Sequence, residues 1–249
     1  MDIPDPKQIL DIKMSQIKQI RDEISVKAVS PALQRKMEEV DRVEQVYASN
    51  AIEGNRLTLR ETELVLRGIT VSGRSLNEHI EANNLAKAWD QMRSLSMKPL
   101  TESAMLDLHA IVLAGIDPTQ AGRFRTEGVR ITGSRLIPAN PASIPAKVTQ
   151  AFSIYLDKDD IDLISKSADL HASITRIHPF IDGNGRVARL VQSIALNQAG
   201  YWPVLISPDD RGQYYEALEK GDEGDPIPYR MFVFDRLIVD GRKKLDLLG

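Results

Sequence analysis

The stretch "HPFIDGNGRVAR", residues 178–189, places a histidine, an aspartate, a Gly-Asn-Gly turn and two arginines within twelve residues. Pro179 disfavours helical geometry for the residue before it, so we expect a helix to end at His178. A histidine has an ordinary pKa of about 6.5 and can accept a proton at neutral pH. Arg186 and Arg189 stand three residues apart, so they share a face of the helix expected to follow. The stretch predicts a loop between two helices that carries a base beside two cations.

The turn within this stretch is suited to binding an anion. Gly183 and Gly185 allow backbone conformations that other residues avoid, and with Asn184 between them successive N–H groups can form one concavity. The following helix adds its positive N-terminal end, and arginines bind phosphate oxygens with two donors at once. Asp182 supplies an oxygen ligand for Mg²⁺, which usually binds through carboxylates and substrate phosphates. The set predicts a polyphosphate site with a metal and a base, as phosphoryl or nucleotidyl transfer requires.

Each part also has an ordinary structural interpretation. Asp-Gly and Asn-Gly are common turn pairs, a histidine before proline often just ends a helix, and arginines on a helix usually face solvent. Their co-occurrence in one contiguous stretch is what favours function. Outside the stretch, His171 fits a hydrogen-bonded helix residue and His109 a structural one. Tyr214, Tyr215 and Asn197 are candidates for the wall of an adenine pocket, with core packing equally expected for the tyrosines.

Composition narrows the class of protein. The chain has 249 residues, of which 42% are apolar and 27% charged, as in an ordinary globular protein. The net charge of −3 argues against a general nucleic-acid binder, and the lack of cysteine excludes disulfides, thiolate zinc sites and a cysteine nucleophile. No apolar run is long enough to span a membrane, and the start "MDIPDPKQIL" does not resemble a signal peptide. We expect a cytoplasmic protein that binds neither nucleic acid nor membrane.

The spacing of apolar residues is helical along most of the chain, so the fold class expected is all-α. Thr58 with Glu61 forms a capping box that starts a short helix, and Ser75 with Glu78 forms another. Other helices are expected at residues 6–25, 31–54, 101–115, 144–156, 162–177, 185–198, 207–220 and 228–248.

One segment breaks the helical pattern. In "VRITGSRLIP", residues 129–138, β-branched and aliphatic residues flank Gly133 and Ser134, a pair that suits a two-residue hairpin turn. We therefore expect one small β-hairpin in an otherwise helical bundle. A soft boundary near "MKPLTES" divides the chain into an N-terminal helical region, residues 1–98, and a core domain with C-terminal helices, residues 99–249.

At every fixed position, residues 178–189 resemble the signature of Fic-domain proteins, His-Pro-Phe-x-Asp/Glu-Gly-Asn-Gly-Arg-x-x-Arg. "AGRFR" at 121–125 and "YYEAL" at 214–218 extend the resemblance over about residues 100–220. The resemblance implies a Fic-type helical bundle and transfer of AMP from ATP to a Ser, Thr or Tyr hydroxyl of a target protein, or of the chain itself. The hairpin at 129–138 would be the family's flap, which aligns a target segment by strand addition.

The resemblance also implies a role for each residue of the signature. His178 would deprotonate the attacking hydroxyl, and Asp182 would hold Mg²⁺ between the α- and β-phosphates. Arg186 would steady the leaving pyrophosphate, and Arg189 would pair with the γ-phosphate. The remaining phosphate oxygens would be received by the loop residues Gly183, Asn184 and Gly185.

A second resemblance lies far upstream, in "SNAIEGN", residues 49–55, which is similar to the family's inhibitory motif, Ser/Thr-x-x-x-Glu-Gly/Asn. Taken alone, the segment is a helix end with Gly54 as its cap. A carboxylate near a helix C-terminus is electrostatically disfavoured, so Glu53 gains from a cationic partner, which the resemblance implies to be Arg189. Ser49 lies one turn earlier on the same face. The expectation is an enzyme inhibited by its own N-terminal part.

Other functions remain alternatives. The same phosphate site could serve removal of AMP from a modified protein, or transfer of UMP or phosphocholine. A non-catalytic nucleotide-binding interaction module is a third class, disfavoured because a scaffold needs no base. The sequence does not identify the target protein, and it leaves a homodimer open.

Overall fold

The structure is a computed structural model that describes residues 5–131, 133–134, 136–157 and 161–248. Within these residues all regular structure is helical, which confirms the all-α class. In chain order the helices are α1 (Pro6–Ser25), α2 (Pro31–Ile52), α3 (Leu59–Leu66), α4 (Leu76–Leu95), α5 (Glu102–Val112), η1 (Pro141–Ser143), α6 (Ile144–Leu156), α7 (Leu163–Ile177), α8 (Asn184–Gln198), η2 (Pro208–Asp210), α9 (Arg211–Asp222) and α10 (Ile227–Leu248). No helix in the described part of the chain is both long and apolar enough to cross a bilayer.

Local capping explains where several helices begin. The Thr58 and Ser75 hydroxyls accept hydrogen bonds from the backbone N–H groups of Glu61 and Glu78, and the two carboxylates return bonds to the capping residues. Both predicted capping boxes are therefore confirmed. Each satisfies two N–H groups that would otherwise lack a partner at a helix start.

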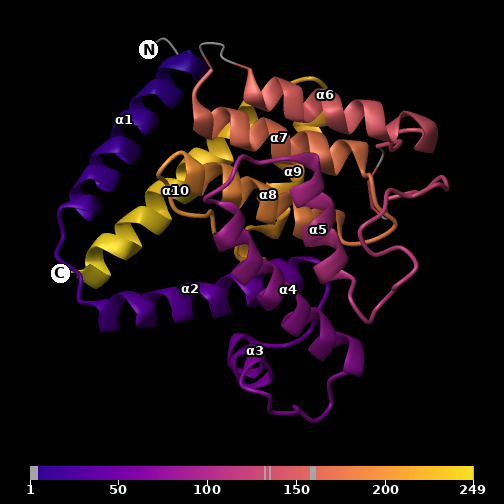
Figure 1. Ribbon diagram of the computed structural model, residues 1–249. Coiled ribbons are helices and arrows are strands. Elements are labelled where there is room, and N and C mark those ends of the chain that lie inside the picture. The colour runs from indigo at the N-terminus through magenta and orange to yellow at the C-terminus, as the bar shows by residue number, and fades with distance from the viewer. Residues whose placement is uncertain (1–4, 132, 135, 158–160, 249) are drawn as a thin grey trace.

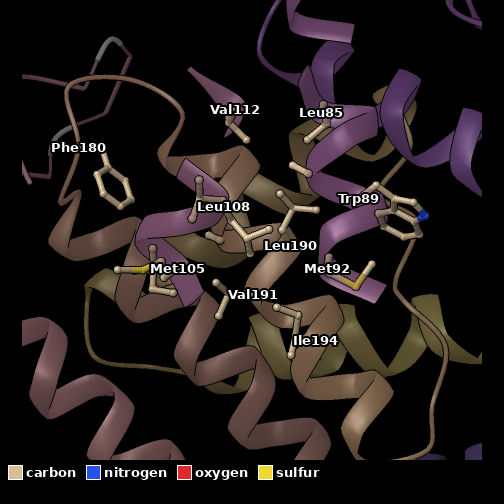
Figure 2. Close-up of a cluster of buried hydrophobic side chains, with 14 of the residues drawn as sticks. Leu85, Trp89, Met92, Met105, Leu108, Val112, Phe180, Leu190, Val191 and Ile194 are labelled. Carbon is tan, nitrogen blue, oxygen red and sulfur yellow. The ribbon is translucent and has the colours of Figure 1, made fainter. Parts of the chain in front are cut away.

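Helix α8, which follows the motif loop, lies in the middle of the bundle (Figure 1). Side chains from α4, α5 and α8 point toward one another and form the larger apolar core, in which Leu85, Leu108 and Leu190 are buried (Figure 2). Burial of each such side chain stabilises the fold by about 1.5–3 kcal/mol. The start of α8 is thereby held at a fixed place beside the end of α7.

A second apolar cluster joins the two ends of the chain. Helix α1 runs alongside α10 (Figure 1), and Ile17 of α1 is buried in the same cluster as Trp202 and Leu237. Helix α2 crosses from there to α4 and α8. The predicted division near residue 98 stays a prediction, although helices on both sides of it share these cores.

The predicted β-hairpin is not formed in the described part of 129–138, from which Thr132 and Arg135 are excluded. A turn is present, since the Ser134 N–H donates to the Ile131 carbonyl at 3.2 Å. The flanking residues, however, are irregular, and Ile137 is 90% exposed. A two-stranded hairpin that packs on no third strand or helix is marginally stable at best. The segment is a loop at the edge of the candidate site.

Candidate active site

His178 stands at the end of α7 in a strained conformation. Its φ of 52° and ψ of 62° are left-handed, and it is the one non-glycine residue with positive φ among the described residues. The following proline excludes helical geometry, as predicted, and the His178 N–H still donates to the Ile174 carbonyl at 3.0 Å. Such a conformation costs on the order of 1–3 kcal/mol and persists where surrounding contacts impose it.

Arg125 imposes part of that conformation. Its guanidinium is 1% exposed and donates to three backbone carbonyls, those of His178 at 2.8 Å, Glu127 at 2.7 Å and Ala139 at 2.6 Å. Its own backbone N–H donates to the Pro179 carbonyl at 2.9 Å. Burial lowers the pKa of Arg125 below its ordinary value. Arg125 thus holds the start of the motif loop against the segment leading to η1, a role that the sequence analysis did not assign.

His109 supports the motif loop through contacts with Phe180 and Asp182. Its ring stacks on the buried Phe180 ring with centroids 3.7 Å apart. Nδ1 accepts from the Gly122 N–H at 3.0 Å, so the hydrogen is on Nε2, which donates to the Asp182 carbonyl at 3.1 Å. Burial lowers the pKa of His109 to about 4, so the ring is neutral at neutral pH. The structural role expected for His109 is therefore specific: it fixes the motif loop at two points.

The turn closes on itself through Asn184. The Asn184 amide accepts from the Phe180 N–H and donates to the Phe180 carbonyl, each at 2.9 Å. The Asn184 side chain is thus used within the loop, so only the backbone of Asn184 is available to an anion. Gly183 has a φ of +79° and precedes the first turn of α8, whose N–H groups have no partner within the helix. These N–H groups form the backbone part of the predicted phosphate site.

Arg186 is enclosed by carboxylates. Its side chain is 3% exposed and donates to Asp182 at 3.0 Å and to Glu81 at 3.2 Å. The other Glu81 oxygen accepts from Asn55, just after α2, at 2.8 Å. Arg186 does not line the cavity, so its predicted contact with pyrophosphate stays a prediction. What it does in the structure is to orient Asp182.

Asp182, the predicted metal ligand, is accessible from the cavity. Its side chain is 59% exposed and lines the cavity, while Oδ1 accepts from the Gly183 N–H at 2.6 Å. No group of three or more metal-binding side chains is found within the described residues. A single accessible carboxylate nevertheless fits Mg²⁺ that takes its other ligands from substrate phosphates and water.

Arg189 joins the motif to the end of α2. Its Nη2 lies 2.7 Å from Glu53 Oε1 and 2.9 Å from the Ser49 carbonyl, and its Nε donates to Ser49 Oγ at 2.8 Å. Burial opposes the charge on Arg189, but the charge and hydrogen bond of Glu53, together with Tyr214 and Tyr215, outweigh burial and raise the pKa of the guanidinium. The structure therefore brings Arg189 into contact with Ser49 and Glu53, which precede it in the sequence by 140 and 136 positions.

Behind Arg189 lies a buried polar chain. Arg189 Nη1 donates to the Tyr214 hydroxyl at 3.4 Å, and this hydroxyl is 2.9 Å from His171 Nε2. Burial lowers the pKa of His171 to about 3, so its ring stays neutral. His171 is the hydrogen-bonded helix residue expected from the sequence. Tyr214 is almost fully buried and supports Arg189, whereas Asn197 lies outside the cavity and bonds Ser96 at 3.3 Å.

A cavity of about 510 Å³ opens where these groups meet. It is lined by His178, Asp182 and residues 183–185 of the motif, and by Glu53 and Tyr215. Part of its lining is formed by Arg130, Ile131, Gly133, Ser134 and Leu136. The Glu53 side chain is 32% exposed and projects into this space from the end of α2.

The family described as Fic/DOC matches residues 99–196. The chain therefore carries a Fic/DOC family domain. It is 34% identical over 239 residues to protein adenylyltransferase Fic of Drosophila mojavensis, covering 93% of this chain and 47% of that protein. The same-named protein of Drosophila erecta is 34% identical over 221 residues. The chain spans less than half the length of these curated relatives.

Solved structures show the same arrangement. Fic-1 from C. elegans superposes with a TM-score of 0.87 at 28% identity, covering 96% of this chain and 73% of that one. A Fic domain containing signaling protein from Bacteroides thetaiotaomicron superposes with a TM-score of 0.86 at 27% identity, covering 94% and 97%. The similarity extends beyond the Fic domain to the N-terminal helices, which include α2.

Proposed function

We propose that the chain is a protein adenylyltransferase that transfers AMP from ATP to a Ser, Thr or Tyr hydroxyl of a target protein, and that Glu53 holds it inactive. One observation carries the proposal: His178 lines a cavity at the N-terminus of α8 together with Glu53, the carboxylate that is paired with Arg189. A neutral base, a backbone anion site and a guanidinium there are what nucleotidyl transfer needs. The curated relatives named protein adenylyltransferase support it.

In the reaction, the target hydroxyl oxygen attacks the α-phosphorus and the bond from this phosphorus to the bridging oxygen of the β-phosphate breaks. Pyrophosphate leaves, and the hydroxyl proton passes to His178. Burial lowers the pKa of His178, so the ring is neutral at neutral pH. Nδ1 faces the Thr175 carbonyl at 3.4 Å and carries the hydrogen, because a carbonyl can only accept. Nε2 is then the atom that receives the proton.

The phosphates are bound by groups on and before α8. The N–H groups of its first turn receive phosphate oxygens, with the positive end of the helix dipole behind them. Asp182 would hold Mg²⁺, which when bound neutralises phosphate charge. Arg189 is the partner for the γ-phosphate. The Glu53 carboxylate is already paired with the Arg189 guanidinium. A triphosphate must therefore displace this carboxylate or bind in a pose that does not react.

Removal of AMP from a modified protein is the second candidate. The observation that favours it is the Glu53 carboxylate itself, which lines the cavity and is partly exposed. Such a carboxylate can orient a water molecule for attack on a phosphoryl group. Incubation of an AMP-modified protein with the wild type and with Glu53→Gln distinguishes the two reactions, since only removal of AMP requires the acid.

Glu53→Gly tests the proposed function. Labelling of a cell lysate with radioactive ATP, followed by mass spectrometry for added AMP, should show strongly increased transfer in this variant. His178→Ala in the same background should abolish transfer while ATP still binds. Glu63→Gly is the matched control, because Glu63 forms an exposed ion pair with Arg67 on α3. Equal labelling by wild type and Glu53→Gly would show that the acid does not inhibit.

Several finer points are proposals of the same kind. The loop 129–138 would dock the target segment, with residues 1–98 acting as the inhibitory part and 99–249 as the catalytic part. The cytoplasmic location and a homodimer stay predictions.

A further inference from the structure

Arg211 connects the cavity with the end of the inhibitory helix. It is the first residue of α9, and its Nε donates to the Ile52 carbonyl at 3.0 Å. Its guanidinium lies over the Tyr215 ring, 5.0 Å from the centroid. Arg211, Tyr215 and Glu53 all line the cavity. Arg211 is an exposed residue. Ile52, whose carbonyl it bonds, is the last residue of α2 and directly precedes Glu53.

The last carbonyls of a helix have no partner within it and carry the negative end of its dipole. In α2 the last four are all satisfied. The chain that follows satisfies two of these carbonyls, since the N–H groups of Glu53 and Asn55 donate to that of Asn50, and the N–H of Gly54 donates to that of Ala51. The other two carbonyls are taken by arginines from elsewhere in the fold: Arg189 bonds that of Ser49, and Arg211 bonds that of Ile52.

No basic residue lies in the last turn of α2, so these two arginines supply the positive charge that favours a helix C-terminus. The two arginines act on different parts of Glu53, its side chain and its backbone. Arg189 binds its carboxylate, whereas Arg211 fixes the peptide unit from which its backbone starts. Loss of the Arg211 contact frees the final carbonyl of α2, and fraying there would carry the Glu53 side chain away from the cavity.

We propose that Arg211 is a positioning residue that holds Glu53 in its inhibitory place. This inference rests on the proposed function, because it assigns a second anchor to the proposed self-inhibition. Arg189 is required for inhibition and for nucleotide binding alike, whereas Arg211 bonds the helix end and lies against Tyr215. It can therefore be removed to weaken inhibition while the catalytic groups stay intact.

Arg211→Gln tests the proposal, with Arg93→Gln as the matched control. Arg93 of α4 contacts the first half of α2 through Glu38 at 2.9 Å, so its loss removes a cation from α2 but leaves the Glu53 end untouched. Rates of AMP transfer should rise about fivefold in Arg211→Gln, the size expected for one lost charged hydrogen bond at an exposed site, and should not change in Arg93→Gln. Arg211→Lys should restore part of the inhibition.

Two further measurements separate positioning from other roles. Hydrogen exchange at the amides of residues 53–55 should quicken in Arg211→Gln only. The double variant Arg211→Gln with Glu53→Gly should transfer AMP at the rate of Glu53→Gly alone, because no inhibitor remains to be positioned.

An unchanged rate in Arg211→Gln, or a double variant slower than Glu53→Gly, overturns the proposal; the latter result would assign Arg211 to nucleotide binding. If Glu53→Gly itself gains no transfer, the proposed function fails instead. Exchange at 53–55 then still decides whether Arg211 holds the end of α2, and unchanged exchange rejects it.

Discussion

The carboxylate of Glu53 occupies the space in which a β-carbon on Gly185 would stand. Gly185 lies in the first turn of α8, where the expected phosphate must approach the backbone. The missing side chain therefore makes room for either of two anions, the phosphate or the inhibitory acid. Arg189, 2.7 Å from the acid, faces the same space. This geometry supports the proposed competition between the two anions.

Gly185→Ala should have opposite effects on stability in two backgrounds. In the wild type the new methyl group displaces the Glu53 carboxylate from Arg189, so we expect a lower free energy of unfolding. With Glu53→Gly the main obstacle is gone, and the Arg189 guanidinium, 3.1 Å from the new carbon, is free to shift. Alanine should then stabilise α8 by up to about 1 kcal/mol through its better helix propensity. Urea unfolding of the four proteins measures both effects. Equal stabilisation in the two backgrounds would mean that Glu53 does not approach Gly185.

Ser49→Ala should release inhibition in part. The Ser49 hydroxyl accepts from Arg189 Nε, and its loss leaves a nearly buried donor without a partner. Arg189 keeps the Ser49 carbonyl and Glu53, so AMP transfer should rise less than in Glu53→Gly. Ser15→Ala is the control, because Ser15 bonds only the Asp11 carbonyl within α1. A rate for Ser49→Ala that matches the wild type would contradict a role for this hydroxyl.

On the acidic side, kcat/KM for AMP transfer should begin to fall only below about pH 6.5. Burial lowers the pKa of His178, and the base is active only when neutral, that is above its pKa. As the pH falls, kcat/KM of the Glu53→Gly protein should therefore hold until the pH passes below about 6.5, the ordinary histidine value, and then decline. A decline centred at or above 6.5 would show that another group governs this limb.

Features encoded by neighbouring residues could be read from the sequence. The bounds of α6 agree with the predicted 144–156, and the capping boxes at Thr58 and Ser75 formed as expected, because caps and apolar spacing act within one or two turns. The hairpin at 129–138 failed because strand pairing depends on what packs against it. Ile137, which reads as a strand residue, instead points into solvent.

In the candidate site, too, residues within one motif could be predicted from the sequence, whereas residues that reach the motif from far along the chain could not. His178, Asp182 and Arg189 were found because their motif is contiguous. Arg125 and His109 were missed as loop supports because each reaches the motif from at least 53 residues away. Nothing in a single sequence distinguishes a buried arginine that bonds carbonyls from one that faces solvent. A fold is needed to bring such partners together.

The stability of the fold should depend on pH through His109. This ring is fully buried, and its pKa is about 4 in the folded protein against about 6.5 in the unfolded chain. Between these values the unfolded chain binds a proton that the folded protein does not, so the free energy of unfolding falls as the pH falls through this window. From pH 7 to pH 5 the loss from His109 should be about 2 kcal/mol.

His109→Gln isolates this contribution. Glutamine does not titrate, so urea unfolding at pH 7 and pH 5 should show a pH-dependent loss that is smaller than that of the wild type by about 2 kcal/mol. His171, whose pKa is also lowered by burial, contributes equally to both proteins and cancels in the comparison. An identical loss in the variant and the wild type would mean that folding does not lower the pKa of His109, so that the ring is protonated in the folded protein at pH 5. It could not then accept the Gly122 N–H, and the support of the motif loop described above would be wrong.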